Sequence, residues 1–119
     1  MNIKRIKGDL GEEYTAKWLR KHRYKVTDTN YSCRFGEIDI IAVKKGFICF
    51  VEVKTRSVDA VDRPASAVGI AKQRRIITTA QHYLASFPCE LQPRFDVAEV
   101  ITCGDKIMDF NYIENAFGE

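Results

Sequence analysis

Two apolar segments separated by a short turn constrain the fold of this chain more than any other feature. Residues 35–43 are mostly apolar but include Asp39, and residues 47–53 are almost wholly apolar until Glu52. Both patterns predict β-strands. The Lys-Gly pair at positions 45–46 predicts that a two-residue loop joins them into a hairpin.

Such a loop fixes which residues of the two strands face each other. Partners then have residue numbers of constant sum, which places Asp39 opposite Glu52 and Glu37 opposite Lys54. Opposed side chains share a face of the sheet with Cβ atoms about 4.5–5.5 Å apart, where like charges destabilise the pairing. A divalent cation between two carboxylates, with a lysine close by, would compensate this repulsion and could activate water against a phosphate.

The alternative is an acid pair that points into solvent and is loosely balanced by Lys54 and Arg56. Charge pairs on exposed faces are ordinary, so this interpretation holds for most acid pairs. Here the neighbouring residues are apolar on both faces of the predicted strands, which indicates buried strands. The surroundings therefore favour a functional role for Asp39 and Glu52.

The composition is that of a globular protein with one domain, spanning residues 1–119. No apolar run approaches the ~20 residues of a membrane span, and the start of the chain does not resemble a signal peptide. We therefore expect a cytoplasmic protein that does not bind a membrane. The four cysteines have no Cys-x-x-Cys spacing, so they predict neither a zinc site nor a redox pair but free, mostly buried thiols.

The net charge of +3 permits a polyanionic partner without requiring one. The basic residues gather at positions 4–7, 20–23 and 72–75. Each cluster could contact phosphates or simply face water. For Lys72, Arg74 and Arg75 both interpretations stay open.

The first predicted helix, residues 8–21, separates two adjacent acids. Glu13 falls on the polar face, where it can pair with Lys17 four residues on. Glu12 falls on the apolar face together with Ala16. Judged alone, an acid at such a position is more often a rim residue than a ligand.

The remaining elements complete an α-β-β-β-α-β-β order. Strands are predicted at 24–31, 95–101 and 106–110, and a helix at 64–86 that begins at Pro64. Residues 111–119 are expected to form a tail that frays.

Two residues in these elements leave alternatives open. Gln73 lies on the face of the second helix that carries Ile77, Ala80 and Leu84, so it could point inward. Asp96 is either a further acid near the site or a strand residue on a polar face, and the second is favoured.

The order of these chemical residues resembles that of the PD-(D/E)xK nuclease superfamily. The residues that carry the resemblance are Glu12, Asp39, the triplet Glu52-Val53-Lys54 and the pair Lys72-Gln73. More narrowly, four segments resemble the bacterial YraN-like family (UPF0102), an uncharacterised group with an expected endonuclease-like fold. They are Gly8-x-x-Gly11-Glu12, Gly36-Glu37-Ile38-Asp39, Phe50-Val51-Glu52-Val53-Lys54-Thr55-Arg56 and Arg94-Phe95-Asp96-Val97.

The resemblance implies an α/β, restriction-endonuclease-like fold with a mixed sheet flanked by helices. It also implies that Asp39 and Glu52 hold Mg²⁺ or Mn²⁺, that Lys54 is the catalytic lysine, and that Glu12 is a supporting acid. Lys72, Gln73, Arg74 and Arg56 are then expected to contact nucleic acid. Gly36-Glu37-Ile38 replaces the proline of the superfamily pattern, which weakens the identification more than the mechanism.

The expected activity is therefore metal-dependent hydrolysis of DNA phosphodiester bonds. The order of residues is also similar to that of archaeal Holliday junction resolvases, which makes branched DNA a candidate substrate and a homodimer plausible. Two alternatives are a nucleic-acid-binding protein that does not cut, and an adaptor that recruits a protein partner through the same fold.

Overall fold

The computed structural model of the chain describes residues 3–60 and 68–118, with side chains for residues 10–59 and 68–118. Its main elements follow the predicted α-β-β-β-α-β-β order, which confirms the expected fold class. They are α1 (Ile3–Lys21), β1 (Lys25–Cys33), β2 (Gly36–Lys44), β3 (Phe47–Ser57), α2 (Ile70–Ser86), β4 (Gln92–Cys103) and β5 (Lys106–Phe117), with a 3-10 turn at Val58–Ala60. No helix in the described part of the chain is long and apolar enough to cross a membrane.

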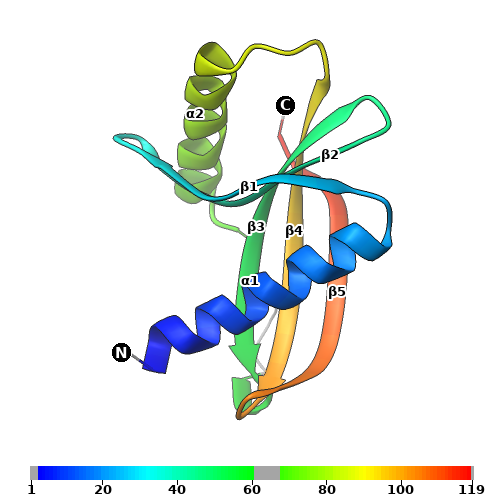
Figure 1. Cartoon of the computed structure of the whole chain (residues 1–119). Coiled ribbons are helices and arrows are strands. Elements are labelled where there is room, and N and C mark those ends of the chain that lie inside the picture. Colours follow the sequence, from blue (N-terminus) through cyan, green and yellow to red (C-terminus); the bar gives the residue numbers. More distant parts are fainter. Residues whose placement is uncertain (1–2, 61–67, 119) are drawn as a thin grey trace.

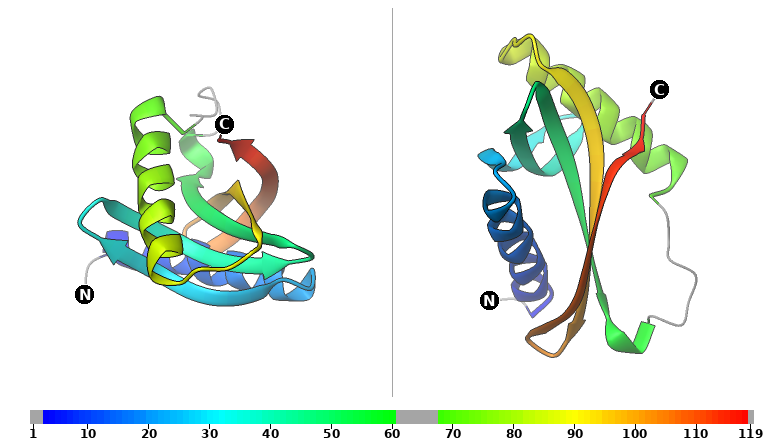
Figure 2. Two further views of the ribbon diagram at one scale, coloured as in Figure 1. Left: turned by 90° about the horizontal axis from the view of Figure 1, so that it is seen from above. Right: turned by 90° about the vertical axis from the view of Figure 1, so that its right-hand side faces the viewer.

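The strands form one mixed sheet in the order β1-β2-β3-β4-β5. Only β3 and β4 pair in parallel, and α2 lies in the connection between them. The other neighbouring strands are antiparallel. Helix α1 packs on one face of the sheet and α2 on the other (Figures 1 and 2). The chain therefore forms three layers with the sheet in the middle.

Each face of the sheet has its own hydrophobic core, and β3 contributes to both. Ile48 and Phe50 pack in the core beneath α2, whereas Cys49 and Val51 pack in the core beneath α1. This alternation follows from the two-residue period of a strand. Burial on both faces explains why the sequence of β3 is an almost continuous apolar run.

The turn between β2 and β3 has the predicted form. Lys45 and Gly46 both have positive φ, 45° and 79°, as a tight hairpin loop of this kind requires. The ladder that follows runs from Lys44–Phe47 to Ile40–Val51, so the register deduced from the turn is confirmed over this stretch. It ends there, one pair before the two acids.

The expectation of a frayed tail after residue 110 was wrong. Strand β5 continues to Phe117, which pairs with Phe95 and stacks on it with ring centroids 5.3 Å apart. The backbone N–H of Asn115 also donates a hydrogen bond to Asp96 at 2.9 Å. These contacts with β4 order the segment that the sequence predicted to fray.

The second helix begins later than expected. Val68 and Gly69 are not helical, and α2 starts at Ile70, so a continuous helix from Pro64 was wrong; Pro64 itself lies outside the described residues. The side chains that α2 buries are Ile76, Thr79, Ala80 and Tyr83, whereas the predicted Ile77 and Leu84 are only half-buried.

Asp96 lies in neither of the two expected places. Its side chain is fully buried and forms a bidentate salt bridge with Arg94, with contacts of 2.9 Å from both Nε and Nη2. The Tyr112 hydroxyl donates to it at 2.5 Å, and Arg94 donates in turn to Tyr24. A buried charge requires such partners. Asp96 is therefore the centre of a structural network on the α1 face, and both sequence-based alternatives were wrong.

The cysteines are free, as predicted, but most of them are not buried. Cys49 alone is buried among them, Cys33 is half-buried, and Cys89 and Cys103 are exposed. The expectation of mostly buried thiols was wrong because two of the four fall in loops or at a strand end.

Candidate active site

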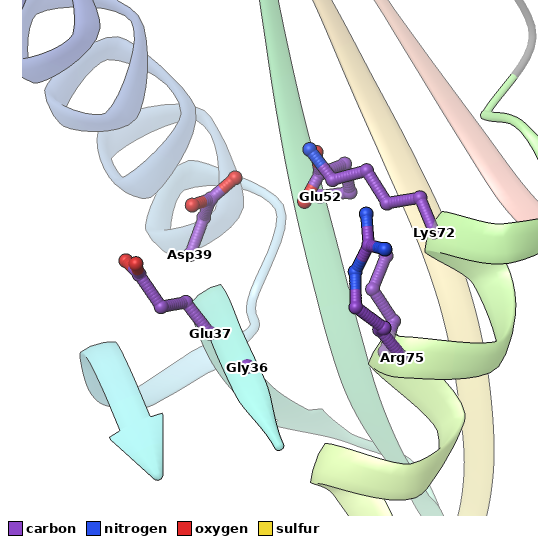
Figure 3. Close-up of a pocket in the computed structure, with 7 residues that line it drawn as sticks. Gly36, Glu37, Asp39, Glu52, Lys72 and Arg75 are labelled. Atoms are coloured by element: carbon purple, nitrogen blue, oxygen red, sulfur yellow. The ribbon is translucent and has the colours of Figure 1, made fainter. Parts of the chain in front are cut away.

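An open cleft of about 290 Å³ lies between β2, β3 and α2. Figure 3 shows carboxylates from the two strands facing cationic side chains that reach across from the helix. The residues that line it are Gly36, Glu37, Asp39, Glu52, Lys72, Arg75 and Ile76. Acids and bases from three elements therefore meet in one place.

The two acids reach this cleft although their backbones do not pair. The β2–β3 ladder ends at Ile40–Val51, so the expected pairs Asp39–Glu52 and Glu37–Lys54 do not form. Instead Asp39 Oδ2 accepts a hydrogen bond from the Val53 N–H at 2.8 Å. Beyond the end of the ladder, the Asp39 side chain thus accepts the hydrogen bond of a β3 backbone N–H in place of a β2 backbone carbonyl.

Asp39 is the most perturbed acid of the cleft. Its pKa is raised to about 7, first by burial and then by the negative charge of Glu52, while the hydrogen bond from Val53 lowers it. Glu12 on α1 adds a smaller upward contribution. A carboxyl group that is buried beside other acids gains from a nearby cation, because the cation favours its charged form.

Glu52 has a cationic neighbour within the chain. Its side chain is only 7% exposed, and Oε2 forms a salt bridge with Lys72 Nζ on the first turn of α2. Lys72 is 49% exposed and enters the cleft from the solvent side. The Lys72 amine therefore compensates the negative charge of the buried Glu52, which would be costly without a partner.

The other predicted site residues lie around this centre. Lys54 is two residues beyond Glu52 on β3, so strand alternation puts it on the same face, but it does not line the cleft. Arg56 forms a salt bridge with Glu99 at 3.8 Å, and Arg74 is exposed on α2. Gln73 donates to the Val68 carbonyl at 2.8 Å and so holds the segment before α2 rather than the cleft.

Glu12 approaches Asp39 from the other helix. It is half-buried and lines a separate depression with Thr29 and Asn30 of β1. Its neighbour Glu13 is exposed and pairs with Lys17 at 3.7 Å, which confirms the predicted division between the two acids. The negative charges of Glu52 and Glu12 thus both raise the pKa of Asp39.

Glu37 and Arg75 both line the cleft, although the sequence did not place Glu37 among the site residues and left Arg75 open between phosphate contact and a solvated face. A signal for Arg75 was present: it is three residues after Lys72, and residues with that spacing lie on the same helix face. The basic cluster at positions 4–7 lies among residues whose side chains are not described, and Arg20, Lys21 and Arg23 are exposed at the end of α1.

The donor set of the cleft suits a small, hard cation. In residues 10–59 and 68–118, no three His, Cys, Asp or Glu side chains are close enough to hold a metal ion by themselves. Mg²⁺ does not need such a set, because it usually keeps several waters and binds one or two carboxylates together with substrate phosphate. Asp39 and Glu52 are the residues that could supply such carboxylates, and the salt bridge of Glu52 with Lys72 shows that the position accepts a positive charge.

Comparison with known proteins identifies relatives over nearly the whole chain. Residues 11–100 match the model of "Uncharacterised protein family UPF0102". A UPF0102 protein from Caldanaerobacter subterraneus is 43% identical over 117 residues, covering 96% of each chain. UPF0102 proteins from Alkaliphilus metalliredigens and Nitrosomonas europaea are 45% and 39% identical, covering 92% and 95% of this chain and 96% and 94% of theirs.

Proposed function

We propose that this chain, which belongs to the uncharacterised protein family UPF0102, is a metal-dependent nuclease that hydrolyses DNA phosphodiester bonds. The observation that supports this most is the meeting of Asp39 and Glu52 with Lys72 and Arg75 in one open cleft. A buried and a half-buried acid can hold a cation, and two bases on a neighbouring helix can hold a phosphate. The likeness to PD-(D/E)xK nucleases in the order of these residues agrees with this proposal.

In the proposed mechanism, Asp39 and Glu52 are the residues that would hold Mg²⁺ or Mn²⁺ through their carboxylate oxygens. When bound, such an ion polarises a phosphate oxygen and lowers the pKa of a coordinated water. Asp39 is oriented for this by its hydrogen bond from Val53, and Glu12 supports its negative field. Lys54, on the same face of β3 as Glu52, stabilises the negative charge that develops as the phosphorus is attacked.

The two bases of α2 position the phosphate. Arg75 presents a planar fork of donors suited to two phosphate oxygens, whereas Lys72 acts as a point charge. Lys72 must leave Glu52 when that acid binds a metal ion, and it then lies beside the phosphate. Substrate binding would thereby replace the Lys72–Glu52 salt bridge by a contact of Glu52 with the ion and a contact of Lys72 with the phosphate.

The test is cleavage of linear, single-stranded and four-way-junction DNA with Mg²⁺ or Mn²⁺. We expect the wild type to cut in the presence of metal, and Glu52→Ala and Lys54→Ala to lose most of the rate. Glu13→Ala is the matched control, because Glu13 is an exposed acid outside the cleft. Equal cleavage by wild type, Glu52→Ala and Lys54→Ala would show that the activity comes from another site or a contaminant.

The same samples test the alternatives. Salt-dependent DNA binding without cleavage would favour a non-catalytic binding protein, and absence of both would favour a protein-interaction role. Sedimentation of the complex with a four-way junction would show whether two copies bind together, as a homodimer acting on branched DNA requires.

A further inference from the structure

The loop between β1 and β2 carries an exposed aromatic side chain next to the cleft. Arg34 and Phe35 form this two-residue loop, which the Cys33–Gly36 pair closes. Phe35 is 37% exposed, and the guanidinium carbon of Arg34 lies 4.8 Å from its ring centroid. Gly36 and Glu37, which follow directly, line the cleft.

The aromatic ring is supported from behind by α2. Phe35 contacts the His82 ring edge-on with centroids 5.7 Å apart, and His82 is hydrogen-bonded to the Tyr31 hydroxyl at 2.8 Å. The loop also lies close against the helix, since a Cβ on Gly36 would be 3.1 Å from Thr79 Oγ1. The ring is thus packed against His82 and has the Arg34 guanidinium over it, and part of this pair is open to solvent.

A ring and a guanidinium presented together suit a particular ligand. Nucleobases stack on aromatic side chains and on arginine, and this contact is sequence-tolerant because every base has a π-face. A base within a duplex is already stacked and paired, so only an unpaired base can use such a surface. The loop is followed directly by Gly36 and Glu37, which line the cleft where the metal ion and the scissile phosphate are proposed to bind.

We propose that Arg34 and Phe35 stack on an unpaired base beside the phosphate held in the cleft, so that the substrate is DNA with unpaired nucleotides at the cut. This inference rests on the proposed nuclease function. It adds the class of substrate, because a pure duplex would leave the loop without its contact. The loop residues bind substrate and take no part in the chemistry.

The chain provides a matched control for this loop. Phe47 is 36% exposed, and the Arg94 guanidinium lies 5.1 Å from its ring centroid, so it forms a similar pair. It lies next to the β2–β3 turn, at the other end of the hairpins from the β1–β2 loop (Figure 1). Phe47 does not line the cleft.

The experiment compares Phe35→Leu, Arg34→Gln and Phe47→Leu with the wild type, in EDTA so that no DNA is cut. The probes are a continuous duplex and a duplex with a three-nucleotide gap that carries fluorescent 2-aminopurine. For the wild type we expect tighter binding to the gapped probe and quenching of 2-aminopurine by stacking. Phe35→Leu should weaken gapped binding about tenfold and abolish the quenching, with duplex binding unchanged. Arg34→Gln should weaken it less, and Phe47→Leu should behave as the wild type.

Three results would overturn the inference. If the wild type binds both probes but Phe35→Leu matches it, or Phe47→Leu loses as much, the loop does not stack on a base, and the proposed nuclease function is untouched. Tighter binding of the wild type to the continuous duplex than to the gapped probe would likewise show that the loop does not stack on an unpaired base. If the wild type binds neither DNA, this inference fails, whereas the proposed nuclease function is judged by the cleavage assay with Mg²⁺ or Mn²⁺. Equal melting temperatures of the variants would show that folding is intact.

Discussion

The substitution Gly11→Ala tests the close packing of α1 on the sheet. Gly11 is buried in α1, opposite Thr55 of β3. A methyl group at this position would overlap Thr55 Oγ1, far inside van der Waals contact, while Thr55 Cβ and Val53 Cγ1 would each be 3.5 Å away. The obstruction is therefore one oxygen atom rather than the backbone of the sheet.

Two effects of opposite sign decide the size of the change. Alanine in a helix is favoured over glycine by roughly 0.5–1 kcal/mol. Overpacking a dense core costs about 1–3 kcal/mol, and the β-branched Thr55 has few rotamers with which to escape. We expect a net loss of about 1–2 kcal/mol from the free energy of unfolding, which corresponds to a melting temperature lower by roughly 3–8 °C.

Urea unfolding of a double-mutant cycle measures both effects. In a Thr55→Ala background the blocking oxygen is gone and the remaining distances are ordinary contacts, so Gly11→Ala should become stabilising by about 0.5–1 kcal/mol. The sign of the effect should therefore reverse between the two backgrounds. Destabilisation of the same size in both would refute the reasoning, because the cost would then not come from Thr55.

Further predictions concern charged groups. Lys72→Met should tighten Mn²⁺ binding measured by calorimetry, about five- to tenfold, because Glu52 no longer has to break a salt bridge; unchanged or weaker binding would contradict this. Since the pKa of Asp39 is raised from 3.8 to about 7, the folded protein holds this proton more tightly than the unfolded chain. In EDTA, the free energy of unfolding should then fall as pH rises from about 4 to about 7, and Asp39→Asn should remove most of this pH dependence. A free energy of unfolding that rises with pH in the wild type would contradict this. Arg94→Met should lower the free energy of unfolding by about 3–5 kcal/mol, because Asp96 would be left as a buried charge with a lost partner; a loss below about 1 kcal/mol in urea titration would contradict this.

Local patterns in the sequence predicted the elements and one stretch of register. The turn at 45–46 fixed the β2–β3 pairing as far as Ile40–Val51, and the helical spacing of Glu13 and Lys17 gave their surface pair. These features depend on neighbours in the chain and on the period of a helix or strand.

What the sequence did not reveal depends on contacts between distant segments. Asp96 is hydrogen-bonded to two residues of β5 as well as to Arg94, and no periodicity in β4 predicts these contacts. The meeting of Lys72 with Glu52 requires the placement of α2 over the sheet, which no local pattern specifies. The parting of β2 and β3 before Asp39 is likewise a property of the twisted sheet rather than of either strand.

If Asp39 holds an ion as proposed, its hydrogen bond from the Val53 amide bears on which ion the cleft would take. Because Oδ2 already accepts a backbone hydrogen bond, coordination through one carboxylate oxygen is favoured over coordination through both. Calcium often takes both oxygens of an acid at longer range, whereas magnesium requires single oxygens in a near-octahedral shell. Under the proposed function, one amide group of β3 would thus favour the smaller ion, because it limits how many oxygens Asp39 can offer to it.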